Sequence, residues 1–363
     1  MTSSTPNMKD PVEAGELKEH RPDALAMESA HSPGADDAYV DDALVDAELD
    51  AEAPERIVTM SRSQLLRRRF LRNPGAWVGM IGFGTLVLLA IFAPMFYHYT
   101  PNETDLRNVL SEPSQYHWFG VNEFGHDVFA RTMQGLRISI IIGLGTAVLT
   151  MIIAVIVGTI SGWMIGRGRL GSFIDITIVN LINLFLVIPS LLLLMLFSTP
   201  LQQWLAERQG GLNSLLGTTF ELRWLVLIPL LALFSWMLAA RVLRAMTQQL
   251  VRTDYVQAAR FMGVNPVVNT WRHVLPNVAS WIIIDTTLGV SAAILGETGL
   301  SFIGFGIQYP LVSLGKVLSE YNIAFPHTWV WPALVLGILV ISINLMGEAL
   351  RDALDPTSGS SRL

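Results

Sequence analysis

Residues 74–97 read PGAWVGMIGFGTLVLLAIFAPMFY, an apolar stretch without a charged side chain. At a rise of about 1.5 Å per residue, a helix of this length exceeds the roughly 30 Å needed to cross the hydrocarbon core of a bilayer. Four arginines lie just before it, at positions 67, 68, 69 and 72. The stretch therefore predicts a transmembrane helix with a basic flank.

Five further apolar stretches follow along the chain. They cover approximately residues 138–165, 173–197, 224–240, 278–295 and 329–346. Each has the length and polarity expected of a membrane-spanning helix. We therefore expect an all-α membrane protein with about six transmembrane helices.

The overall composition agrees with a membrane protein. Hydrophobic residues make up 51% of the chain and charged residues 15%, and the mean hydropathy is +0.45. Soluble domains carry roughly a quarter charged residues. The chain has no cysteine, which excludes disulfides, thiolate catalysis and Cys-ligated metal sites.

The net charge of −6 conceals two parts of opposite sign. Residues 1–56 contain 15 Asp and Glu against four Lys and Arg, an excess of 11 negative charges, whereas the remainder contains 15 acids against 20 bases. The acidic segment has too few large apolar side chains to offset its chain entropy. We expect a disordered tail over residues 1–56, a basic juxtamembrane segment over 57–73, a transmembrane domain over 74–356 and a short C-terminal tail over 357–363.

The loops between the predicted spans differ in their basic content. One alternate set carries the arginines of residues 62–72, 167–169, 241–272 and 351, while the other set mixes Lys and Arg with more Asp and Glu. Cytoplasmic loops of membrane proteins are enriched in Lys and Arg. Both tails are therefore expected on the cytoplasmic side.

The longest predicted cytoplasmic connection, residues 241–276, has the residues of two short helices joined by a corner. Asp254 can cap the first helix with Gln257 reaching back to it, and Gly263 can end that helix in a left-handed conformation. Asn265 followed by Pro266 begins the second. Leu275 and Pro276 are expected to break the second helix where the fifth span begins.

The first short helix presents an apolar stripe at helical spacing, made of Tyr255, Ala258, Ala259 and Met262. An apolar surface outside the membrane requires a partner. The alternative is that both short helices lie in the membrane interface beside their own bundle.

Two stretches in this connection carry a family resemblance. Residues 254–263, DYVQAARFMG, and residues 272–277, RHVLPN, resemble the coupling loop of binding-protein-dependent ABC importer permeases. The resemblance implies a type I permease bundle whose coupling helix inserts into a groove of a cytoplasmic ATPase. It assigns coupling to the residues of this loop: Tyr255, Gln257, Ala258, Ala259, Met262, Gly263, Leu275 and Pro276. The family often has Glu where this chain has Gln257, a change that preserves length and hydrogen bonding.

Other stretches narrow the resemblance to the dipeptide, oligopeptide and nickel permease group. The external segment HWFGVNEFGHDVFAR at 117–131, followed by GLRIS at 135–139, resembles the segment before the second span. AILGETGLSFIGFG at 293–306 and NLMGEALRDALDP at 344–356 resemble the second of two paired permeases. The chain departs from the common pattern at Val121, Asn122 and His126, and again in the loop QYPLVSLG at 308–315.

The resemblance implies a permease subunit of an ATP-driven importer in a bacterial inner membrane, with di- or oligopeptides as the favoured substrates and nickel or another small solute as the alternative. The implied partners are a second permease subunit, two cytoplasmic ATPase domains or subunits, an extracytoplasmic solute-binding protein and membrane lipid, with no nucleic acid. ATP and Mg would bind to the ATPases. This chain has no G-x-x-x-x-G-K-[ST] loop and is expected to be neither an enzyme nor a cofactor-binding protein.

Acidic residues within the predicted spans define a second set of candidates. Asp285 lies in an apolar stretch, where an unpaired carboxylate is costly, so it either lines the translocation path or hydrogen-bonds to a neighbouring helix. Glu297 is a candidate for substrate contact, for a hinge or for packing. Asp175 is expected to pair with Arg169 or Arg167.

Two other classes of function remain open. An ion-driven secondary transporter could use Asp285 and Glu297 as proton carriers, although such a carrier has no need of a coupling loop. A membrane metalloenzyme is disfavoured because no two histidines have the close spacing of a zinc site, so no metal is expected.

Overall fold

The computed structural model describes residues 62–216 and 223–354, with side chains over 64–208 and 224–354. The predicted tails at 1–56 and 357–363 lie outside these residues. The described part is built from helices, with two isolated β-bridges in the loop before α4. In chain order the helices are α2 (Arg62–Arg72), α3 (Pro74–Phe96), α4 (Val128–Met164), α5 (Gly168–Val187), α6 (Ser190–Leu216), η1 (Arg223–Val226), α7 (Leu227–Leu233), α8 (Trp236–Val251), α9 (Asp254–Phe261), α10 (Pro266–Asn269), η2 (Thr270–Val274), α11 (Leu275–Phe302), α12 (Leu314–Ser319) and α13 (His327–Leu354).

Five of the described helical segments are long and apolar enough to cross a membrane: α3, α4, α5, the continuous helix from α10 through α11, and α13. The pair α7 and α8 is a sixth candidate, bent by 44° at a short break. Helical order and span number therefore confirm the predicted all-α architecture.

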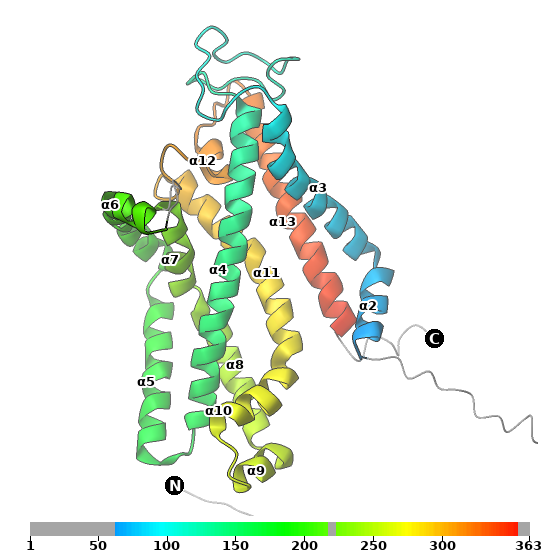
Figure 1. Ribbon diagram of the computed structural model, residues 1–363, viewed down its shortest axis with the longest axis vertical. Helices are drawn as coiled ribbons and strands as arrows, with labels where there is room; N and C mark the ends of the chain where they lie inside the picture. Colours follow the sequence, from blue (N-terminus) through cyan, green and yellow to red (C-terminus); the bar gives the residue numbers. More distant parts are fainter. Residues whose placement is uncertain (1–61, 217–222, 355–363) are drawn as a thin grey trace, which may run out of the picture. The chain divides into compact units, whose positions relative to one another are not determined.

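The long helix α4 organises the bundle. It packs most extensively on α8 and α11, and α13 pairs with α3. Figure 1 shows α4 between α5 on one side and the α3–α13 pair on the other. Gly158 and Gly162 allow the contact with α8, because an added Cβ would lie 2.7 Å from the Ala240 carbonyl oxygen and 2.6 Å from the Thr247 Cβ. Small residues at this spacing permit close helix approach in membranes.

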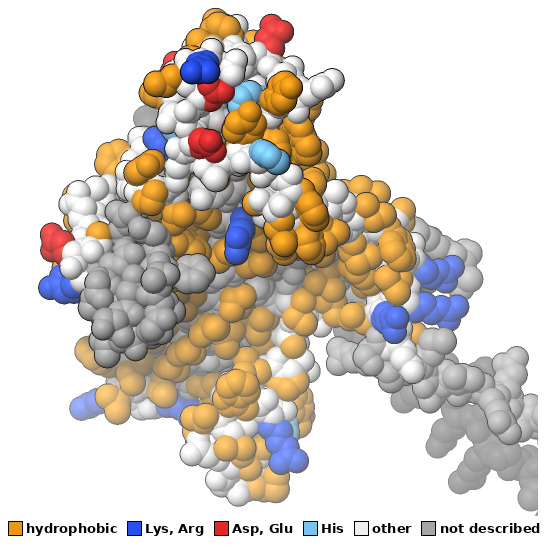
Figure 2. Space-filling model, turned by 45° about the horizontal axis from the view of Figure 1, so that its top comes forward, with side chains coloured by type: hydrophobic (Ala, Val, Ile, Leu, Met, Phe, Trp, Pro, Cys, Tyr) orange, Lys and Arg blue, Asp and Glu red, His pale blue; other side chains and the backbone are white. Residues whose placement is uncertain are grey.

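The apolar side chains lie both inside and outside the bundle. The middle of the face in Figure 2 is largely hydrophobic, and most of the acidic side chains visible there lie over the loops at the top. Lipid-exposed helices need this distribution because the hydrocarbon core solvates apolar groups and not charges.

The predicted span over 173–197 is wrong in its second half. Helix α5 ends at Val187, and Ile188 has extended backbone angles, φ −81° and ψ 126°. Pro189 follows, and proline disfavours helical geometry in the residue before it and supplies no N–H. The chain then begins the separate helix α6, which Figure 1 shows at an angle to α5.

The predicted span over 224–240 is also not one straight helix. Its first part ends at Leu233, and the amides of Phe234 and Ser235 donate to carbonyl groups three residues back. The Ser235 hydroxyl donates to the Leu231 carbonyl at 2.8 Å. This side chain competes for a backbone acceptor, which bends a helix.

Candidate functional site

The predicted corner between the two short helices is present. Gly263 has φ +81°, and its N–H donates to the Arg260 carbonyl at 3.0 Å. Asn265 then caps α10 by accepting a hydrogen bond from the Val267 N–H at 2.9 Å, and Pro266 is the first helical residue. The left-handed glycine and the Asn–Pro start follow the local rules that predict them.

The predicted capping by Asp254 is wrong. Thr253 holds the cap position and Asp254 is the first helical residue. The Thr253 hydroxyl donates to the Leu250 carbonyl at 2.6 Å, so it caps no α9 amide. Gln257 reaches back further than expected and donates to the Arg252 carbonyl at 3.1 Å. The side chains therefore tie α9 to the end of α8.

The predicted apolar stripe on α9 is divided by tertiary packing. Val256 and Ala259 are buried, and Val256 packs with Trp163 and Val274. Asn269 donates to the Val256 carbonyl at 3.2 Å, which fixes α9 against the second short helix. Of the four predicted stripe residues, Ala259 faces the bundle while the other three are exposed.

A larger apolar surface lies on the outer side of this segment. We call it the coupling face; its members are Tyr255, Phe261, Met262, Val267, Val268 and Trp271. Phe261 is 85% exposed, Met262 77% and Trp271 70%. The sequence argument had not assigned Phe261 to the site, although its position beside Met262 was an available signal. The exposed guanidinium groups of Arg260 and Arg272 lie in the same segment.

The predicted break at Leu275 and Pro276 is wrong. The backbone continues through the π-helix η2 into α11, and Leu275 has helical angles, φ −57° and ψ −42°. The wider turn accommodates the proline ring and its missing N–H without ending the helix. The Asn277 side chain also donates to the His273 carbonyl at 2.7 Å. The coupling face is thus continuous in backbone with the α11 span.

The predicted partner of Asp175 is also wrong. Arg244 of α8 donates from Nε and Nη2 to its two carboxylate oxygens at 2.7 and 2.8 Å. Ser161 of α4 donates to the same carboxylate at 2.5 Å. Arg167 instead lies over the Trp163 ring at 4.5 Å. This bidentate pair joins α4, α5 and α8 at the coupling end of the bundle.

Asp285 is half-buried on α11. It forms no hydrogen bond or ion pair with any other residue that the structure describes. The hydroxyls of Thr286 and Thr287 donate to backbone carbonyls of their own helix. The hydrogen bond to a neighbouring helix, one of the two roles considered for Asp285, is therefore not formed within the described residues.

Glu297 is fully buried. Its carboxylate accepts hydrogen bonds from Ser139 of α4 at 3.0 Å and from Ser301 of α11 at 2.5 Å. The same two hydroxyls accept bonds from the Leu314 and Ile307 amides of the following loop and α12. This arrangement favours a packing role for Glu297 over substrate contact.

Residues that depart from the family pattern meet in the loops at the end of the bundle opposite α9 (Figure 1). Asn122 donates to Glu320 at 2.9 Å, and buried Arg131 donates to the other oxygen of that carboxylate at 2.7 Å. Beside them is a cavity of about 190 Å³, whose lining includes His126 and residues of the divergent 308–315 loop. Burial raises the pKa of Glu320 above its ordinary value. Glu320 had not been singled out from the sequence because its partners are nearly 200 positions away.

A second polar cluster fixes the start of α4. The Asp127 carboxylate caps the Ala130 N–H at 2.7 Å and contacts His117 at 2.8 Å and the Tyr97 hydroxyl at 2.6 Å. Burial and this carboxylate raise the pKa of Tyr97. Within residues 62–216 and 223–354, no group of three or more His, Asp or Glu side chains is arranged to hold a metal ion.

The helical bundle, with five or six candidate spans among its described helices, is that of a multi-pass membrane protein. Residues 154–359 match the family model of the binding-protein-dependent transport system inner membrane component, and residues 61–113 match that of the N-terminal TM domain of oligopeptide transport permease C. The chain belongs to the first of these families, and it is an inner-membrane protein.

Curated relatives extend the likeness over most of the chain. The oligopeptide transport system permease protein OppC of Mycobacterium tuberculosis is 39% identical over 305 residues, covering 83% of this chain and 97% of the relative. The protein of the same name from Bacillus subtilis is 35% identical over 291 residues, covering 79% and 87%. A putative peptide permease protein of Brucella ovis is 33% identical over 293 residues, covering 79% and 89%.

Proposed function

We propose that this chain is one permease subunit of an ATP-driven oligopeptide importer. Its relatives are named oligopeptide or peptide permeases, which supports peptides as the substrate class over nickel or another small solute. The chain would pair with a second permease subunit and receive substrate from an extracytoplasmic solute-binding protein. ATP and Mg would bind to two cytoplasmic ATPase domains or subunits, and both termini of this chain would be cytoplasmic.

The observation that carries this proposal is the coupling face. Three of its side chains are at least 70% exposed, and Figure 1 shows α9 at the end of the bundle where α5 begins. Covering one large apolar side chain contributes about 1.5–3 kcal/mol. A groove that covers Phe261 and Trp271 would therefore contribute favourably to the docking of an ATPase, as part of a larger interface.

The proposed coupling residues are the eight that the sequence resemblance identified, joined now by Phe261 and Trp271. Ala259 would act from the inner side of α9 by setting its distance from the bundle. Gly263 would aim the second short helix. Leu275 and Pro276 would transmit a movement of the coupling face into α11, the helix that carries Asp285 and Glu297.

A transport assay separates the substrate classes. Cells that lack this gene should lose uptake of radiolabelled tri- to pentapeptides and regain it with the wild-type gene. A variant with Phe261→Asp and Trp271→Asp should restore membrane abundance without restoring peptide uptake or ATPase co-purification. Loss of nickel uptake with unchanged peptide uptake would replace peptide by nickel as the substrate.

The ion-driven alternative depends on Asp285, because this half-buried carboxylate has no partner among the described residues. An ion-driven carrier should stop when a protonophore collapses the proton gradient in vesicles loaded with ATP. The ATP-driven importer should continue under that condition and should stop with vanadate. In the importer, Asp285→Asn should lower uptake without removing its ATP dependence if Asp285 lines the path.

A further inference from the structure

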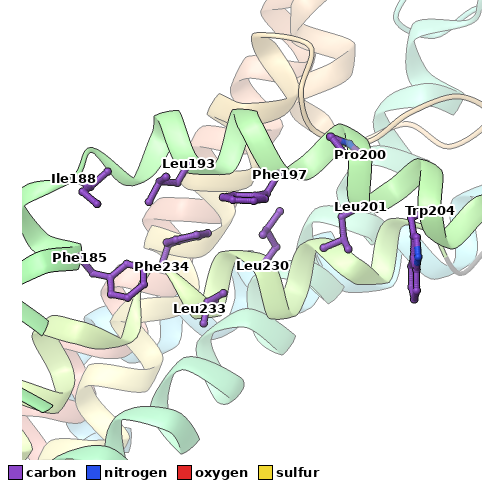
Figure 3. Close-up of a pocket in the computed structure, with 10 residues that line it drawn as sticks. All are labelled: Phe185, Ile188, Leu193, Phe197, Pro200, Leu201, Trp204, Leu230, Leu233 and Phe234. Carbon is purple, nitrogen blue, oxygen red and sulfur yellow. The ribbon is translucent and has the colours of Figure 1, made fainter. Parts of the chain in front are cut away.

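An apolar groove lies between the start of α6, the end of α5 and α7, away from the coupling face. It has a volume of about 710 Å³, and its lining residues are Phe185, Ile188, Leu193, Phe197, Pro200, Leu201, Trp204, Leu230, Leu233 and Phe234. Figure 3 shows the α6 side chains on one wall and those of α7 facing them, with Phe185 and Ile188 at one end and Trp204 at the other. The volume falls within the range of about 300–1,000 Å³ typical of ligand sites.

The shape of the groove is set by backbone breaks. Ile188 and Pro189 turn the chain from α5 into α6, and the bend at Phe234 and Ser235 ends the opposite wall. A packed interior normally closes a void of this size with side chains. Here the described helices are held apart and none of the described side chains fills the groove, so it is open to an occupant.

The position of the groove indicates that its occupant comes from the lipid bilayer. Helix α5 has 20 residues, a length of about 30 Å that matches the hydrocarbon thickness. Its last turn, which carries Phe185, therefore lies about one hydrocarbon thickness from the Gly168 end of α5, on the side away from the coupling face. Trp204 lies at the other end of the groove, and tryptophan favours the boundary between hydrocarbon and headgroups.

The rim also carries a charge. The Arg208 guanidinium lies 4.3 Å from the centre of the Trp204 ring, and no carboxylate among the described residues forms an ion pair with it. An apolar trough that ends at a basic group beside an interfacial tryptophan has the polarity of one phospholipid. A helix of a second permease would instead need an apolar or small-residue face along its whole length.

We propose that the groove between α5, α6 and α7 binds one acyl chain of an anionic phospholipid, with the phosphate at Arg208. The lipid forms the missing wall of the broken span and keeps α6 apart from α7. This role requires that the protein is embedded in the membrane and is independent of the transported solute.

The test uses the purified whole transporter in nanodiscs. Phosphatidylglycerol with a diazirine near the end of one acyl chain is photoactivated, and the labelled residues are mapped by mass spectrometry. Label should concentrate on the groove residues of α6 and α7 compared with the exposed α5 residues Leu170 and Phe173. Leu230→Trp, which fills the groove, should remove that label, whereas Ile176→Trp on the exposed face of α5 should not.

The headgroup is tested separately. Arg208→Gln should lower the labelling preference for phosphatidylglycerol over phosphatidylcholine about fivefold, the effect of one basic side chain near an anionic surface. Label of equal density in the groove and on the exposed α5 face would reduce the occupant to bulk lipid and overturn the proposal. Crosslinking of a photoreactive residue at Leu233 to the second permease would also overturn it. Failure of peptide uptake would change neither readout.

Discussion

Gly263 is the residue on which the direction of the coupling face depends. An added Cβ would meet no atom within 4 Å, so a side chain there is opposed only by the left-handed backbone. That cost is about 1–2 kcal/mol for an ordinary residue and is smaller for Asn. We predict that a reconstituted transporter with Gly263→Val in this chain hydrolyses ATP without matching uptake, while the variant reaches normal abundance in the membrane. Gly263→Asn should retain more coupling between ATP hydrolysis and uptake. Wild-type coupling in the Val variant would contradict this role.

His126 should make the free energy of unfolding depend on pH. Burial, assisted by the charge of Arg131, lowers the pKa of His126 below its ordinary value of 6.5. The unfolded chain therefore binds the proton first, and folding loses stability as the pH falls through that ordinary value. Between about pH 7.5 and about pH 5.5, His126→Gln should reduce the fall in Tm of the detergent-solubilised protein.

The control for this measurement is His98→Gln, because His98 is an exposed histidine of the same connection between α3 and α4. It should leave the pH dependence of Tm as in the wild type. If the Tm of the His126 variant falls with pH as steeply as that of the wild type, groups other than His126 produce the fall. Glu320 is not one of them, because its raised pKa adds stability as the pH falls.

At the scale of one element, the inner side of α9 packs against the bundle, whereas its outer side is exposed. Val256 is 1% exposed, whereas Met262, just after the helix, is 77% exposed. Val256→Ala should cost about 2 kcal/mol of stability by leaving a cavity, seen as a lower Tm. Met262→Asp should leave Tm unchanged and should abolish co-purification of the ATPase. Equal effects of the two changes on Tm would mean that the outer side is part of the fold and not a docking surface.

In the other elements, local sequence signals set some helix boundaries and packing sets others. Helix α4 begins ten residues before the predicted span because Asp127 caps it outside the membrane. Helix α5 ends early because of Pro189, a signal that was present in the sequence within an otherwise apolar run. The bend before Ser235 had no comparable signal, since serine hydroxyls bond to helix carbonyls in straight helices as well.

The whole molecule combines a basic membrane domain with an acidic N-terminal segment. That segment carries 11 excess negative charges, and an anionic inner leaflet should repel it. We predict that deletion of residues 1–55 leaves peptide uptake and assembly with the second permease intact. Uptake per unit of membrane-inserted protein is the measurement. A well-expressed deletion protein that fails to assemble would show that the segment is a structural part of the transporter.

The sequence by itself determined the features that depend on neighbours along the chain. Length and polarity predicted most of the spans, because each span is one continuous apolar stretch. Gly263 predicted the corner, and Asn265 with Pro266 the second short helix, because these signals act within about one helical turn. The resemblance to a coupling loop could be seen in the sequence for a similar reason, since its residues lie close together along the chain, and the coupling role stays a prediction.

Only the tertiary structure decided which distant side chains meet. Asp175 pairs with Arg244 and not with its neighbours Arg167 and Arg169, and Asn122 meets Glu320, because helix packing brings these groups together across 69 and 198 positions. Packing also buried Ala259 and Val256 while it exposed Phe261. One sequence pattern is compatible with several rotations of a short helix, and contacts with α4 and η2 select one of them. The same kind of contact between separate elements leaves the groove beside α6 open.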